Sequence, residues 1–171
     1  MSIRTFRHEI YFVSGRNEEA GMHFFSKTFN VSFEEAIAAA RQALERQGFE
    51  VFAEIDMQRA FKKTLAVDFR PYRVLGAYHP ALAHRAIQVS DEIGSIMLCN
   101  IVVQRRDDDC IKISAVDLTT VAYATNNVEL RWIVLDLRDR LQNAIKNINA
   151  KPVTQHRILE TNMSRGQESA A

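Results

Sequence analysis

Apolar residues in the middle of the chain recur with two alternating periods, either every second position or every third and fourth position. The aromatic and β-branched residues at positions 22–31 predict a strand. Ser32 and Glu35 then form a capping-box pattern, which predicts the start of a helix that ends at Gly48. Positions 49–55 alternate between two sides and predict a half-buried strand.

The alternation of helices and strands continues in the next segment. Asp56 can cap a short helix, and positions 72–77 predict a strand. Pro80 suits the first turn of a helix, because its missing N–H would have no partner there anyway. This helix is expected to run to about Val89 and to be broken at positions 91–94.

Positions 95–104 are apolar on both faces. That pattern is typical of a strand at the centre of a sheet or of one covered by a second subunit. A charged tip at 105–109 is followed by a strand at 110–115 in which the side chains alternate between two faces. This pattern predicts an antiparallel hairpin. Asn126, with Glu129 as its capping-box partner, is expected to begin a long helix with an apolar stripe wide enough to pack on a sheet.

This order of elements predicts an α+β sandwich in which one mixed sheet packs against helices. No linker rich in Pro, Gly or Ser interrupts positions 22–150, so they are predicted to form a single domain. Positions 1–21 are expected to form an N-terminal arm; a docked arm is favoured over an edge strand or a partner-binding peptide. Positions 151–171 are polar and predict a mobile tail.

Composition narrows the function classes. The chain has 22 Lys and Arg against 21 Asp and Glu, so it lacks the positive field that a nucleic-acid or anionic-membrane binder needs, and neither partner is expected. Two cysteines are too few for a disulfide framework, and no segment reads as a signal peptide or a membrane span. A soluble, cytoplasmic protein is predicted.

Cys99 is the first candidate for chemistry. It could be a reactive thiol or a soft metal ligand, but its neighbours on the same strand face are Met97, Ile101 and Val103. Apolar neighbours disfavour the thiolate, so a buried and inert cysteine is the preferred interpretation. The hairpin separates Cys110 from Cys99 by roughly 15 Å or more along the ladder, which predicts two free thiols.

Histidine and acidic residues give little support to a catalytic or metal site. His79 and His84 are five positions apart, about 500° around a helix, and therefore diverge instead of forming a metal-binding pair. The acidic residues 107–109 beside Cys110 are interpreted as a solvated hairpin tip. Because nucleophile elbows, phosphate loops and zinc spacings are missing from the sequence, we predict no catalytic residue, no metal site and no cofactor.

The turn at positions 76–80 is the sharpest binding hypothesis. Free amides at the start of the following helix, together with His79, could hold an anion, with Arg70 or Arg73 supplying charge and Tyr78 covering the site. The simpler alternative is that Gly and Pro only shape a short connection. The predicted ligand-binding residues are Arg70, Arg73, Tyr78, His79, Cys99 and Asn100.

Several short motifs together resemble one family. They are Gly48-Phe49, Glu54-Ile55-Asp56, residues 69–76, residues 80–83 and residues 99–103. On these motifs the chain resembles the domain of unknown function 302 family over residues 26–149. The resemblance implies a small α+β fold and a homodimer, but no activity, since the family's biochemical role is not established. Many members of that family have Cys-Asn-Pro where this chain has Tyr78-His79-Pro80, and Pro where this chain has Leu98. The resemblance therefore does not carry a two-cysteine site over to this chain.

Three classes of function remain open. The leading hypothesis is a non-catalytic homodimeric module that binds a protein partner or a small ligand, with an anionic ligand as the candidate. The second is a thiol- or metal-dependent redox or sulfur-handling protein that uses Cys99. The third is a structural or assembly component whose N-terminal arm or C-terminal tail binds a partner.

Overall fold

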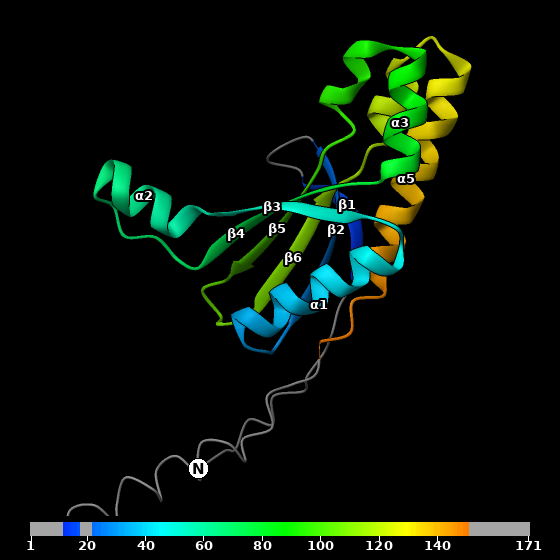
Figure 1. The fold of residues 1–171 in the computed structure, drawn as a ribbon. Coiled ribbons are helices and arrows are strands. Elements are labelled where there is room, and N and C mark those ends of the chain that lie inside the picture. The colour runs from blue at the N-terminus through cyan, green and yellow to red at the C-terminus, as the bar shows by residue number, and fades with distance from the viewer. Residues whose placement is uncertain (1–11, 18–21, 151–171) are drawn as a thin grey trace, which may run out of the picture.

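The computed structural model of the chain describes residues 12–17 and 22–150 (Figure 1). In chain order the elements are β1 (Phe12–Asn17), β2 (Met22–Phe29), α1 (Phe33–Arg46), β3 (Glu50–Asp56), α2 (Met57–Leu65), β4 (Tyr72–Tyr78), α3 (Pro80–Val89), the 3-10 helix η1 (Asp91–Ser95), β5 (Cys99–Arg105), β6 (Ile111–Val116), α4 (Thr119–Ala124) and α5 (Val128–Lys146).

The six strands form one sheet in the order β1-β2-β6-β5-β4-β3, and every neighbouring pair is antiparallel. The predicted α+β class is confirmed, but the prediction of a mixed sheet is wrong. A parallel neighbour needs a connection that carries the chain back along the sheet. Instead, α2 and α3 extend beyond opposite ends of the sheet, so the chain leaves and re-enters at the same end (Figure 1).

Helices α1 and α5 cover one face of the sheet and enclose the core with it (Figure 1). The strands contribute alternate residues to this face, which is why the sequence alternates so regularly there. The largest fully buried side chains are Phe25, Phe29, Leu44, Phe49, Leu75, Ile101, Ile111, Ile113, Ile133, Leu137, Leu141 and Ile145. The centre of the stripe predicted for the last helix is buried where α5 packs on β2 and β6, whereas Val128 and Trp132, which widen the stripe, stay exposed.

The predicted helix start at Ser32 is confirmed in detail. The Glu35 amide donates to Ser32 Oγ at 3.3 Å, and the Ser32 amide donates to Glu35 Oε2 at 3.1 Å. These two bonds satisfy donors that would otherwise lack an intrahelical partner. The short helix after Asp56 and the helix that begins at Pro80 are also present.

Two boundaries and one helix differ from the sequence prediction. The cap of α5 is Asn127 instead of Asn126, and Asn127 Oδ1 accepts from the Leu130 amide at 3.0 Å. Strand β5 begins only at Cys99, because η1 occupies Asp91–Ser95. Helix α4 was missed: it has six residues, too few to show a helical period, and the Asp117 carboxylate holds its start through Thr119.

Residues 1–11, 18–21 and 151–171 lie outside the described part of the chain, and with them the predicted tail and most of the predicted arm. From the arm, β1 is an edge strand that pairs with β2. Within the described ranges, the structure contains no helix with both the length and the apolar character needed to cross a bilayer.

Candidate functional site

The turn at positions 76–80 places His79 as the cap of α3. His79 Nδ1 accepts from the Leu82 amide at 3.4 Å, so one of the amides predicted to be free for an anion is already bonded. The ring packs edge-on against Phe49, with centroids 5.7 Å apart. Burial lowers the pKa of His79 and Arg140 lowers it further, so the imidazole is mostly neutral at pH 7 and offers an anion little charge.

Arg73 is engaged in an ion-pair cluster on the helix-covered face. Its Nε lies 3.0 Å from Glu54 Oε1 and its Nη1 lies 2.6 Å from Asp56 Oδ2, while the guanidinium stacks over Phe33. The hydrogen bond from Arg41 lowers the pKa of Glu54 and outweighs burial, and Arg73 lowers it further. The charge of Arg73 therefore holds β3, β4 and the start of α2 together.

Replacing Arg73 by Met should destabilise the protein by about 1–2 kcal/mol, because Asp56 loses its ion pair and Glu54 keeps only Arg41. Urea unfolding would measure the loss. Arg85→Met is the control: it breaks the more exposed pair with Glu129 and should cost less than about 0.5 kcal/mol. Equal losses in the two variants would contradict a structural role for Arg73.

The other predicted ligand residues lie in different surroundings. The Tyr78 hydroxyl donates to Glu50 Oε2 at 2.8 Å across the β3–β4 pair, and Asn100 is exposed opposite Gly76. Arg73 and Tyr78 are an odd number of residues apart in β4, so they point to opposite faces of the sheet. Arg70 precedes β4 and donates to Gln104 Oε1 at 2.9 Å. The structure therefore does not bring the six predicted residues into one site.

Cys99 is 1% exposed and points into the core opposite Ala77. Burial raises the pKa of its thiol to about 12, so almost none of it is thiolate at neutral pH. The predicted burial is confirmed, and both Cys99 and Cys110 are free thiols. A redox function through Cys99 would require this part of the core to open. Among the described residues, no three His, Cys, Asp or Glu side chains are grouped as metal ligands would be.

One face of the sheet remains accessible. On the side away from α1 and α5, Ile55, Val74 and Val102 are aligned across three strands, and Phe52 packs over Gly76. Phe52, Ile55 and Leu98 are each at least half exposed. We call this surface the open face. Its members on β3, on β4 and on or next to β5 are Phe52, Ile55, Tyr72, Val74, Tyr78, Leu98 and Val102.

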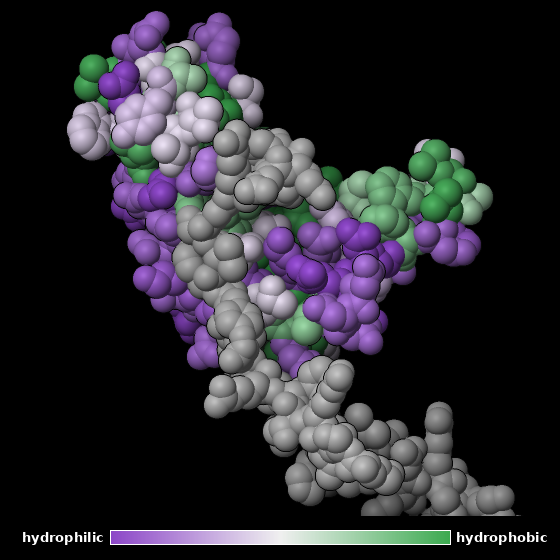
Figure 2. Space-filling model, turned by 180° about the vertical axis from the view of Figure 1, so that it is seen from behind, coloured by the Kyte–Doolittle hydropathy of each residue, from purple (hydrophilic) through white to green (hydrophobic). Residues whose placement is uncertain are grey.

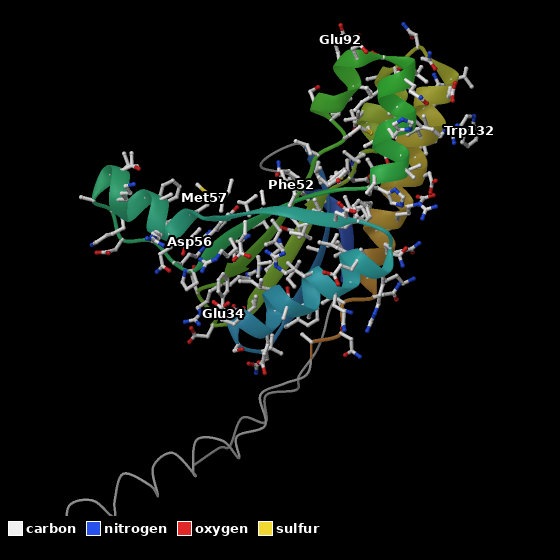
Figure 3. The ribbon with its side chains drawn as sticks, viewed as in Figure 1. Glu34, Phe52, Asp56, Met57, Glu92 and Trp132 are labelled. Atoms are coloured by element: carbon white, nitrogen blue, oxygen red, sulfur yellow. The ribbon has the colours of Figure 1, made fainter. Side chains whose placement is uncertain are left out.

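Helix α2 projects from the edge of the open face (Figure 1). None of its nine residues is buried, and Leu65 at its end is 63% exposed. Met57 begins α2 directly after Asp56, and Figure 3 shows both residues at the junction of α2 with β3. Seen from behind, the surface of α2 is mainly hydrophobic (Figure 2). The open face and α2 therefore present adjoining apolar surfaces.

A polar cavity of about 360 Å3 lies where the α2–β4 loop meets the β5–β6 hairpin. It is lined by Arg70, Gln104, Arg106, Asp107, Asp108 and Lys112. The sequence predicts Arg70 as a ligand of the turn at positions 76–80, and residues 107–109 as a solvated hairpin tip. The grouping was not visible in the sequence, because Arg70 and Gln104 are 34 positions apart and meet only through the β4–β5 register.

Comparison with known proteins gives a family and a fold. A family model described as "Domain of unknown function DUF302" matches residues 25–148. The structure resembles one described as "Crystal structure of uncharacterized conserved protein DUF302 from Bacillus stearothermophilus", with a TM-score of 0.66, 20% sequence identity, and coverage of 74% of this chain and 98% of that one. At that identity the likeness shows the fold alone. No curated protein matches the chain.

Proposed function

Since this chain belongs to the DUF302 family, whose function is unknown, we propose from its own geometry that it is a homodimeric binding module in which a second copy covers the open face and α2. The single observation that carries this proposal is α2. A nine-residue helix is too short to be stable alone in water and needs packing on its apolar side. Within one copy none of its residues is fully buried, and its apolar residues Met57, Ala60 and Phe61 are only half-buried.

A second copy is the occupant that this surface suits best. A twofold interface has to be self-complementary, since the same patch meets itself. Each copy offers a projecting helix with exposed Leu65 and a neighbouring apolar sheet face with exposed Phe52 and Ile55. Helix α2 of one copy can therefore lie on the open face of the other, and the reverse contact forms by symmetry.

Pairing through the free edge of β3 is the less favourable alternative. The register of β3 shifts between Val51 and Ala53, which marks a bulge. A bulge on an edge strand interrupts the row of free backbone groups that another strand would need. The face of the sheet is thus a better contact than its edge. The two free cysteines fit the reducing compartment that we propose for the protein, the cytoplasm.

Leu65→Glu should convert the dimer to a monomer. Burying one leucine stabilises an interface by about 1.5–3 kcal/mol. A twofold dimer contains this contact twice, so the dimer Kd should rise by about 100-fold or more. Sedimentation equilibrium would show a mass near twice 19.5 kDa for the parent protein and near 19.5 kDa for the variant.

Trp132→Glu provides the control for that experiment. Trp132 is 66% exposed, close to the 63% of Leu65, but it lies on α5, away from the open face (Figure 3). The control variant should stay dimeric. A monomeric parent protein, or dissociation by Trp132→Glu with Leu65→Glu still dimeric, would refute the proposed interface.

A further inference from the structure

We infer that the polar cavity between the α2–β4 loop and the β5–β6 hairpin is a binding site for a small molecule with a tetrahedral oxyanion, such as a phosphoryl or sulfate group. The site is distinct from the turn at His79. It does not require the proposed dimer, because all its lining residues come from one copy.

The strand register brings the cavity's side chains to one place. Gln104 and Lys112 are direct partners in the β5–β6 pair and therefore point to the same side of the sheet. Tyr72 is the partner of Gln104 on the other side, and Arg70 precedes it by two residues. The hairpin tip, from Arg106 onward, closes the end of the cavity.

Arg70 is held in place before any ligand binds. Its guanidinium stacks over the Phe69 ring at 4.8 Å and lies 5.9 Å from the Tyr72 ring, while Nη2 donates to Gln104 Oε1 at 2.9 Å. Stacking uses the face of the guanidinium and leaves N–H groups on its edge for an oxyanion, which arginine can bind with two parallel bonds. An arginine fixed in this way loses less side-chain freedom on binding.

The charges of the cavity are not balanced internally. Three cations face two carboxylates, and Asp108 is already used: it accepts from the Cys110 amide at 3.2 Å and lies 3.7 Å from Arg106 Nε. Within the described part of the chain, neither Arg70 nor Lys112 has a carboxylate at ion-pair distance. Against Arg70 and Lys112 the cavity sets only the carboxylate of Asp107, and the net positive charge that remains favours an anionic ligand.

The cavity also indicates what the rest of the ligand should carry. A volume of about 360 Å3 exceeds that of a bare phosphate ion and lies at the low end for small-molecule sites. Asp107 lines the cavity and would repel a second anionic group, but it can accept from a hydroxyl or an ammonium group. A hydroxylated or amine-bearing phosphate ester therefore fits better than a polyanion. Figure 2 shows hydrophilic surface beside the apolar surface of α2 on this side of the molecule.

Titration calorimetry at constant ionic strength would test the site with inorganic phosphate and glycerol 3-phosphate, with glycerol as the neutral control. We expect saturable binding, with Kd on the order of 1 mM for phosphate and a lower Kd for the ester. Lys112→Gln and Arg70→Gln should each weaken the binding of both by at least tenfold. Lys63→Gln, which removes an exposed cation of α2 outside the cavity, should leave Kd within about twofold.

The outcomes separate a specific site from non-specific ion binding and from the dimer. No saturable binding by the parent protein, or an equal loss in Lys112→Gln and Lys63→Gln, would overturn the inference. Thermal unfolding of each variant without ligand shows whether a loss of binding reflects misfolding. If Lys112→Gln is destabilised, Arg70→Gln gives a second measurement, because Arg70 is exposed. Leu65→Glu should keep the parent Kd for phosphate, and Lys112→Gln should keep the parent mass, so the two proposals fail independently.

Discussion

Alkylation of the native protein should modify Cys110 and leave Cys99 untouched until the protein unfolds. Cys99 is 1% exposed, and burial raises the pKa of its thiol to about 12. Below pH 9, a pKa near 12 in place of the usual 9.0 lowers the fraction of thiolate about a thousandfold, before access is considered. Cys110 is only half-buried; burial and the nearby Asp108 raise its pKa, so it should react slowly but measurably.

Peptide mapping after iodoacetamide treatment at pH 8 measures the two cysteines separately. In guanidinium chloride both should be alkylated at similar rates, and the Cys110→Ser variant should lose the native reaction altogether. Alkylation of Cys99 in the native protein at the rate of Cys110 would contradict the structure and reopen the redox alternative. Protection of Cys99 would leave binding, through the open face or the polar cavity, as the favoured class of function.

The burial of Cys99 shows which features the sequence predicts well. Alternation along a strand identifies the side of the sheet, so the partners Met97, Ile101 and Val103 indicated burial without knowledge of the fold. The capping box at Ser32 is equally local. That every strand pair in the described residues is antiparallel was not predictable in this way, because strand direction depends on where α2 and α3 lie relative to the sheet.

The candidate site was harder to predict than the fold for the same reason. Arg73 was a plausible anion ligand as an isolated cation, but the β3–β4 register places Glu54 and Asp56 beside it. Arg70 and Lys112 belong to one cavity only because β5 lies between β4 and β6. Local sequence patterns specify a helix cap or the buried face of a strand. A group of charged side chains from several strands depends instead on strand order and register, which are properties of the whole sheet.

Gly48→Ala should be strongly destabilising, by about 1.5–4 kcal/mol, for two separable reasons. Gly48 ends α1 with φ at +82°, a left-handed conformation that costs an alanine about 1–2 kcal/mol. A Cβ atom at this position would also lie 2.8 Å from His79 Nε2. To avoid it, the His79 ring must leave Phe49 and the Leu82 amide, which removes the cap of α3 at a further cost of about 0.5–2 kcal/mol.

A double-mutant cycle with His79→Ala separates the two reasons. In that background the clash is gone, so Gly48→Ala should cost only the backbone part, about 1–2 kcal/mol, and the coupling between the two positions should be about 1 kcal/mol. Gly94→Ala is the control, because its Cβ would meet only Ile87 at an ordinary 3.8 Å and its φ is not positive. Urea unfolding measures all four variants. Additive losses at positions 48 and 79 would show that His79 does not pack against Gly48, and that the His79 ring does not couple the end of α1 to the start of α3.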